Sequence, residues 1–217
     1  MLLSKAESAA IEARSAQVEA RVGAQVVAAI VGKAGAHAEL QWKAFAIGAV
    51  LSAMAMVVAD ALRPQWLTGS AALVSAVTIL GAGGASALLA VVSPAYARLF
   101  LRSIRRDAEV RRCAEALFLH HQLFKTRQRN GVLIMVSCFE RKVEILADVG
   151  FHQRVAEREW RSVIDRITPL LRARRFADAL LEALAGTEAL LAAKGFAATP
   201  GSANELPDRP IDESGAA

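Results

Sequence analysis

Two long apolar runs stand out in the amino-acid sequence. The first, residues 44–62, has one charged side chain, Asp60 near its end, and the second, residues 67–92, has none. At about 1.5 Å of helix rise per residue, each run is long enough to cross the roughly 30 Å hydrocarbon layer of a membrane. The sequence therefore predicts two transmembrane helices, at 44–62 and 67–92.

The short connection between the runs, residues 63–66, makes them a hairpin whose two ends return to the same side of the membrane. Lysine and arginine are concentrated in the segments outside the hairpin, whereas the connection carries only Arg63. Positive charge favours the cytoplasmic side. We therefore expect a two-pass protein of the lipid bilayer with both termini in the cytoplasm.

Two other readings of the apolar runs are less consistent with their length and place. Buried core helices of a soluble bundle rarely run this far without a polar face. A secretory signal would lie close to the N-terminus, whereas the first run begins after more than about forty residues of charged, helix-patterned sequence.

The segments on either side of the hairpin have the pattern of an α/β domain. Residues 24–31 and 131–139 are nearly unbroken apolar runs, which is typical of strands covered on both faces. Residues 142–150 alternate, with Glu144 and Asp148 on the face opposite Val143, which predicts a half-buried strand. Helices are expected at 3–21, 95–127, 152–174 with a kink or break at Pro169, and 176–195. The resulting division is 1–43 for the first helix and strand, 44–62 and 67–92 for the spans, 95–198 for the remainder of the domain, and 199–217 for a flexible tail.

Composition and charge add a candidate lipid contact. The chain has 217 residues, 54% hydrophobic and 6% aromatic, with a formal net charge of +5. Much of the positive charge follows the second span, where it sets topology and suits anionic lipid. No nucleic-acid-binding motif accompanies it, so we expect no nucleic-acid partner. Cys113 and Cys138 are expected to be reduced and buried. The arginines expected to contact lipid are Arg98, Arg102, Arg105 and Arg106.

The second half of the chain resembles the TPM domain family, which includes thylakoid-lumen phosphatase-like proteins and photosystem II repair factors. The resemblance is carried by residues 131–168: an apolar strand, a tight turn, a second strand of the form RKVEI followed by a glycine, and a helix with Trp160 and Ile164. The tail NELPD, residues 204–208, is similar to the ending of a bacterial membrane-bound subgroup in which two spans interrupt the domain after its first strand. The resemblance covers roughly residues 2–31 and 95–210.

This resemblance implies a TPM-like α/β sandwich with a small mixed sheet, split by the inserted transmembrane hairpin in a bacterial inner (cytoplasmic) membrane. Three positions depart from the family pattern. Gln25 stands where family members tend to have an acidic residue, and Arg174 and Ala179 stand where glycines are common. These departures bear on any anion or metal site that the family carries.

Association of the wider family with acid phosphatase activity makes a phosphate site worth seeking. A hydrolase needs a nucleophile, a metal, or converging cations and carboxylates. The candidates are Asp148, Glu144 and Arg141, of which Asp148 is favoured because it adjoins Gly150, where a turn brings backbone amides together. The simpler alternative is that these charges form a solvated strand face.

The sequence contains no motif typical of a metal-binding or nucleotide-binding site. His120 and His121 point about 100° apart on a helix, and His152 is distant, so we expect no metal or cofactor. Gly81-Ala82-Gly83-Gly84 lacks the Lys-Ser/Thr of a phosphate loop and lies inside the second span. Small residues in that span have a packing use instead: one every fourth position would let a helix approach closely. The two complementary sets are Thr78, Ala82, Ser86 and Ala90, and Ala44, Gly48 and Ser52.

The sequence therefore favours a membrane-anchored interaction or assembly module with an unidentified membrane-protein partner. An acid phosphatase-type hydrolase on a membrane anchor is the alternative. A pore formed by the hairpin is a third reading, disfavoured because Asp60 is the only charge in the spans.

Overall fold

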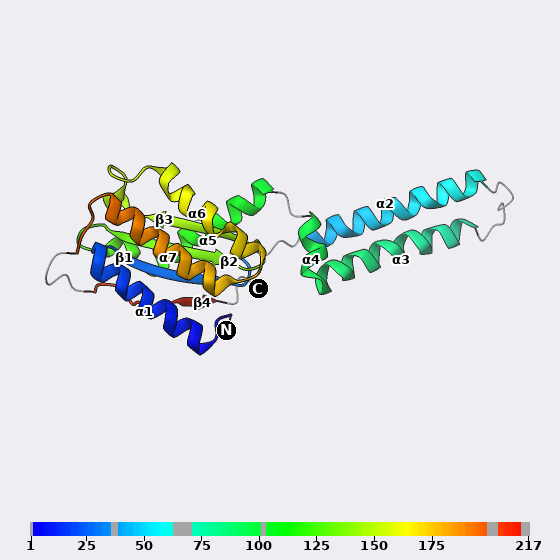
Figure 1. Ribbon diagram of the computed structural model, residues 1–217. Coiled ribbons are helices and arrows are strands. Elements are labelled where there is room, and N and C mark those ends of the chain that lie inside the picture. Colours follow the sequence, from blue (N-terminus) through cyan, green and yellow to red (C-terminus); the bar gives the residue numbers. More distant parts are fainter. Residues whose placement is uncertain (1, 36–38, 63–70, 101–102, 199–203, 214–217) are drawn as a thin grey trace. The chain divides into compact units, whose positions relative to one another are not determined.

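The computed structural model describes residues 2–35, 39–62, 71–100, 103–198 and 204–213 (Figure 1). The chain forms two compact units, one made of residues 1–36 and 106–217 and the other of residues 37–105. The first unit is therefore assembled from two parts of the sequence, with the second unit inserted between them. The predicted split α/β architecture is confirmed.

A four-stranded mixed sheet with the order β3-β2-β1-β4 forms the centre of the first unit. Strand β1 (Gln25–Val31) pairs in parallel with β2 (Gly131–Ser137), although about a hundred residues separate them. Strand β3 (Lys142–Ala147) pairs antiparallel with β2 through a tight turn. Every residue of β1 and β2 is buried, as their unbroken apolar runs predicted.

The fourth strand corrects the prediction of a flexible tail at 199–217 for residues 211–213; residues 199–203 and 214–217 lie outside the described part of the chain. Residues 211–213 form β4 (Ile211–Glu213), which pairs in parallel with β1. The side chain of Asp212 also accepts hydrogen bonds from the backbone N–H groups of Leu2 and Leu3, at 2.9 and 3.1 Å. The tail was predicted to be flexible because it lacks an apolar face of its own. Residues 211–213 are ordered instead by pairing with the edge of β1 that β2 leaves open.

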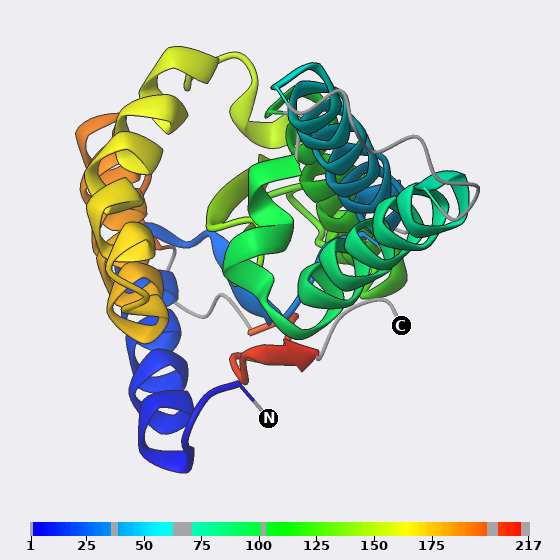
Figure 2. The same cartoon turned by 90° about the vertical axis from the view of Figure 1, so that its right-hand side faces the viewer.

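Helices cover both faces of the sheet (Figure 2). Helices α1 (Lys5–Val22), α6 (Glu157–Arg172) and α7 (Phe176–Ala193) lie on one face, and α5 (Ser103–His120) lies on the other. The two cores receive alternate residues of β1: Val26, Ala28 and Ile30 face the first layer, while Val27, Ala29 and Val31 face α5. This alternation is the period-two geometry of a strand buried on both sides.

Helix boundaries follow local capping signals. A capping box between Ser4 and Glu7 begins α1, and Gly23, in the left-handed region at φ 68°, ends it as predicted. The helix predicted at 95–127 is divided into α4 (Pro94–Ala97), a 3₁₀ turn at Arg98–Phe100, α5, and a 3₁₀ turn at Leu123–Lys125. Gln122 takes a left-handed conformation, which redirects the chain after α5.

The next helix also differs from its prediction. The helix predicted at 152–174 begins only at Glu157, because residues 149–151 form a 3₁₀ turn, and Pro169 does not divide it.

The second unit contains two long apolar helices, α2 (Glu39–Leu62) and α3 (Ala71–Val92). They pack through the small residues that the sequence singled out. A Cβ added to Gly48 would lie 2.7 Å from the Cβ of Ser86 and 2.8 Å from the backbone oxygen of Ala82. The hydroxyl of Ser86 donates a hydrogen bond to the backbone oxygen of Ala44 at 2.7 Å. The stripe of small residues is therefore used within the hairpin.

We expect Gly48→Val to separate α2 from α3, because the added methyl groups would overlap the backbone of α3. The hydroxyl of Ser52 lies 3.5 Å from the backbone oxygen of Thr78, so cysteines at these two positions report helix contact. In a chain lacking the native cysteines, disulfide yield between Ser52→Cys and Thr78→Cys should fall severalfold with Gly48→Val. Gly84→Val is the matched control, since nothing lies within 4 Å of a Cβ there. Equal yields in both variants would contradict the packing.

Candidate functional site

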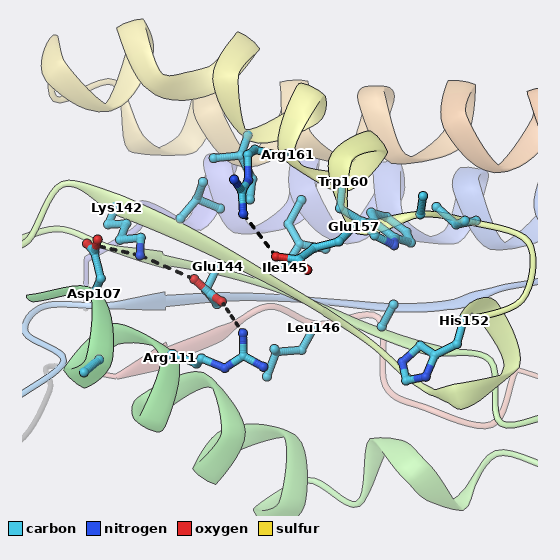
Figure 3. Close-up of a pocket in the computed structure, with 16 residues that line it drawn as sticks. Asp107, Arg111, Lys142, Glu144, Ile145, Leu146, His152, Glu157, Trp160 and Arg161 are labelled. Carbon is cyan, nitrogen blue, oxygen red and sulfur yellow. Dashed lines mark hydrogen bonds and ion pairs between the residues drawn. The ribbon is translucent and has the colours of Figure 1, made fainter. Parts of the chain in front are cut away.

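An open groove of about 910 Å³ runs along the free edge of β3 (Figure 3). Strand β3 is the last strand of the sheet, so only one of its edges is paired with β2. Helix α5 forms one wall of the groove and α6 forms the other. The groove therefore combines unpaired backbone with side chains from two helices that cover opposite faces of the sheet.

The α5 wall carries a chain of ion pairs. The ammonium of Lys142 lies 3.2 Å from the carboxylate of Asp107 and 3.7 Å from that of Glu144. The guanidinium of Arg111 lies 3.9 Å from Glu144 on its other side (Figure 3). Burial raises the pKa of Glu144, and the neighbouring charges of Lys142 and Arg111 oppose that rise. The carboxylate is thus held between two cations at the floor of the groove.

The α6 wall is apolar at its base and charged at its rim. Trp160 is buried and Ile164 is packed against the core, so both present hydrocarbon to the groove. Arg161 and Glu157 form an ion pair of 3.1 Å one helical turn apart, with both side chains mostly exposed. Exposed pairs of this kind contribute less than about 1 kcal/mol. Either side chain could therefore leave this ion pair and bind a charged ligand at a small cost in free energy.

The three residues proposed from the sequence occupy separate places. Glu144 faces the groove, but Asp148 lies beyond the end of β3, where its side chain caps the 3₁₀ turn Val149–Phe151. The strand predicted at 142–150 is therefore too long, and Glu144 and Asp148 do not share a strand face. Gly150 explains the turn: its N–H donates to the backbone oxygen of Arg129, and an added Cβ would lie 2.5 Å from that oxygen.

Asp148 is fully engaged in holding this turn. Its two oxygens accept from Arg129 at 2.7 and 2.9 Å, and one also accepts from the N–H of Val149 at 2.8 Å. Burial alone would raise the pKa of Asp148, but these hydrogen bonds and the charge of Arg129 lower it below its usual value. Arg141 lies in the turn between β2 and β3 with φ 49°. No recorded contact among the described residues joins Arg141 to Glu144 or Asp148.

Of the described histidines and cysteines, only His152 lines this groove, at one end of it. The rings of His120 and His121 meet edge to face with centroids 5.1 Å apart, and burial lowers the pKa of His121. Cys113 and Cys138 are free thiols and partly buried, and burial raises the pKa of Cys138 to about 11. Across the described residues there is no group of three or more His, Cys, Asp or Glu side chains that could hold a metal ion.

Comparison with known proteins identifies the family. Residues 97–190 match the family model of the TPM domain. The chain contains a TPM domain. A solved structure, the NMR structure of BA42 protein from the psychrophilic bacteria Bizionia argentinensis sp. nov., superposes with a TM-score of 0.56 over 97% of this chain and 94% of that chain, at 14% identity. That likeness shows a shared fold. The search of curated proteins found no match.

The TPM domain extends on both sides of the region matched by the family model. Strand β1 lies before the match and β4 lies after it, yet both belong to the same sheet as β2. The structure shows the surroundings of two of the positions that depart from the family pattern. Arg174 takes the left-handed backbone conformation, with φ 61°, that a glycine would adopt without steric cost. Ala179 belongs to α7 and is fully buried in the core.

The third departure, Gln25, belongs to a polar cluster that the sequence reasoning missed. Its side-chain oxygen accepts hydrogen bonds from the backbone N–H groups of Glu205 and Leu206, at 2.6 and 3.0 Å. Next to it, the carboxyl of Glu19 accepts from the N–H of Val26 at 2.7 Å. Burial, together with the negative charge of Asp208, raises the pKa of Glu19 to about 8. The similarity of residues 204–208 to a family ending was the available signal, but it did not reveal which residues they contact.

We expect Asp148→Asn to destabilise the TPM domain by about 1.5–3 kcal/mol, because hydrogen bonds to a charged, buried group are among the stronger ones. Urea denaturation followed by circular dichroism measures the change. Asp178→Asn is the control: its ion pair with Arg175 is exposed, so its loss should cost less than about 1 kcal/mol. Equal effects of the two substitutions would show that Asp148 does not hold the turn.

We also expect stability to depend on pH through Glu19. The folded protein keeps the Glu19 proton up to a pKa of about 8, whereas the unfolded chain releases it near the ordinary value of 4.5. The folded state therefore binds more protons between these values, and the free energy of unfolding should fall as pH rises through this window, by up to about 1.4 kcal/mol per unit. Denaturation midpoints measured from pH 5 to 8.5 should fall in the wild-type protein and change less with pH in Glu19→Gln. Glu12→Gln, exposed on the same helix, should leave it unchanged.

Proposed function

We propose that this protein is anchored in the cytoplasmic membrane by α2 and α3, and that its TPM domain is an interaction module in the assembly or maintenance of a membrane complex. The exposure of the two apolar helices carries the membrane part of the proposal. In the 18-residue apolar stretch of each helix that could span a membrane, the buried share is 0% for α2 and 11% for α3. A core helix of a soluble protein would be mostly covered.

Exposed hydrocarbon of this extent is costly in water and favourable in lipid. Val57, Leu62 and Val92 are 69%, 76% and 72% exposed, and other large apolar side chains of both helices are similar. At roughly 25 cal/mol per Å² of apolar surface, leaving these two helices in water would cost many kcal/mol. A lipid bilayer removes that cost, which supports α2 and α3 as spans.

The fold of the TPM domain restricts the topology. Parts of the chain before and after the hairpin pair within one sheet, as β1 does with β2 and β4. Both parts must then lie on the same side of the membrane. The lysines and arginines outside the hairpin favour the cytoplasmic side. Arg98 and Arg106 are the described members of the arginine set proposed to contact anionic lipid; Arg102 and the side chain of Arg105 lie outside the described part of the chain.

The state of the acidic candidates favours an interaction role over catalysis. Asp148 is committed to Arg129 and the turn, and Glu144 lies between Lys142 and Arg111. A general acid or base needs a carboxyl that can reach a substrate proton. The groove instead offers a mixed surface and an unpaired strand edge, which suit a polypeptide partner.

A phosphatase remains the second candidate, supported by the family association and by the cations of the groove. Lys142, Arg111 and Arg161 line one cavity, where a phosphate group would meet positive charge. In this alternative Glu144 would be the proton-transferring group, because Asp148 is already engaged.

Topology is tested with reporters fused at the C-terminus of the full chain. We expect a green fluorescent reporter to be bright and an alkaline phosphatase reporter to be inactive, because the former folds in the cytoplasm and the latter outside it. The opposite pair of results would contradict the assignment of the termini.

Function is tested with tagged full-length protein purified from its own membranes. We expect a specific membrane protein to co-purify, and p-nitrophenyl phosphate not to be hydrolysed above the level of a Glu144→Gln variant. Hydrolysis that is lost in Glu144→Gln, with the circular dichroism spectrum unchanged, would replace the interaction role by the phosphatase. Asp148→Asn is unsuited to this test because it alters the turn.

A further inference from the structure

The two edges of the sheet differ in how they are protected against further pairing. At one edge, β4 is only three residues long, carries Asp212 and Glu213, and is contacted by the backbone of Leu2 and Leu3. Short, charged edges of this kind resist the addition of a strand. At the other edge, β3 is six residues long and lies along the groove between α5 and α6. Among the described residues, the β3 edge is therefore the one open to an added strand.

The register of β3 identifies the backbone groups that face the groove. The N–H of Asp148 donates to the oxygen of Gly131 at 2.9 Å, which makes these two residues a hydrogen-bonded pair. Such pairs alternate along an antiparallel ladder, so the amide groups of Val143, Ile145 and Ala147 point away from β2. Val143 is buried, whereas Ile145 and Ala147 are partly exposed. Each of these two residues offers one donor and one acceptor with no partner recorded among the described residues.

We propose that this groove binds one extended polypeptide segment as an additional strand on β3, and that the segment has alternating apolar and polar residues and little net charge. The inference deepens the interaction role proposed above and rests on it. The bonding groups would be the backbone of Ile145 and Ala147. Main-chain bonds supply affinity in this mode of recognition, and alternate side chains supply selectivity.

The walls of the groove select the alternating pattern. An added strand continues the pleat, so its side chains point alternately toward the two faces of the sheet. On the face shared with Ile145 they meet the apolar base of α6, where Trp160 and Ile164 lie. On the face shared with Leu146 they meet the ion-pair chain of Arg111, Glu144 and Lys142 beneath α5. Apolar side chains fit the first wall and polar side chains the second.

The charges of the lining favour a segment with little net charge. Three cations and three carboxylates line the groove, and each is within 4 Å of an opposite charge. These pairs neutralise one another locally. A strongly acidic or basic segment would have to break pairs without meeting a field of the opposite sign. The six residues are Arg111, Lys142, Arg161, Asp107, Glu144 and Glu157.

A second copy of this chain is a poorer fit than a single strand. The β3 strand of another copy would bring its own flanking α5 and α6 to the mouth of the groove, where the first pair of helices already stands. A free extended segment has no such flanks. Pairing between copies is therefore kept as an outcome that would overturn the proposal.

The test uses the full chain in lipid nanodiscs and a fluorescent probe peptide of about seven residues. The probe alternates threonine and valine and carries one lysine and one glutamate at its ends, so that its net charge is zero. A matched probe has the same sequence with the backbone nitrogens of alternate residues methylated, in both possible phases. Fluorescence anisotropy measures binding, and hydrogen exchange measured by NMR reports the amides of Ile145 and Ala147.

We expect saturable binding of the unmodified probe, weakened at least about tenfold by methylation in one phase and by Ile145→Pro. Proline there removes only an outward-facing donor at a sheet edge, a place where proline is tolerated. Exchange at Ile145 and Ala147 should slow when the probe is added. If Ile145→Pro does not fold, the two methylated probes still decide the matter.

The proposal would be overturned by no saturable binding, by equal binding of all probes, or by protection of Ile145 and Ala147 that grows with protein concentration in the absence of probe. The last would assign the edge to a second copy. A membrane protein that co-purifies equally with wild type and Ile145→Pro would leave the interaction role standing and remove only the groove from it. Failure of the interaction role itself is recognised separately, by phosphate-ester hydrolysis that depends on Glu144.

Discussion

The parallel pairing of β1 with β2 is the contact on which the rest of the molecule depends. It joins residues 25–31 to residues 131–137 across the whole inserted hairpin. Parallel strands need a crossover connection, and in most α/β proteins a single helix supplies it. Here the crossover contains α2, α3 and α5, and α5 then covers the face of the sheet opposite α1, α6 and α7. The hairpin is therefore part of the connectivity of the TPM domain.

This connectivity has consequences for both ends of the chain. Because β1 lies inside the sheet, it has a second edge, and that edge pairs with β4 from the far end of the sequence. The N-terminal residues then bind to β4 through the side chain of Asp212. The first and last described segments of the chain thus meet at β4, which is itself paired with β1.

The opposite side of the sheet is organised by charge and by unpaired backbone. The antiparallel turn from β2 leaves β3 as an edge, and the helices on the two faces place ion pairs along it. In the same region the Arg129–Asp148 pair secures the turn that ends β3. Asp148, which the sequence placed among the candidates for catalysis, is therefore a structural carboxylate outside the lining of the groove. A carboxylate next to a glycine turn fits either role, and only its partner distinguishes them.

Local pattern and composition were enough to predict several elements of the fold. The unbroken apolar runs of β1 and β2, the capping box and Gly23 of α1, and the complementary small residues of α2 and α3 all occur where local chemistry predicts them, because periodicity, capping and steric size act over a few neighbouring residues. The family resemblance added that the two spans interrupt one domain after its first strand. Three contacts became known only from the folded chain: Gln25 binds the backbone of residues 205 and 206, Asp148 pairs with Arg129, and residues 211–213 form β4. The two side-chain contacts join positions 19 and 180 residues apart, beyond the reach of any local pattern. The burial of Glu19 and the open edge of β1 likewise arise only when the sheet and its helices come together.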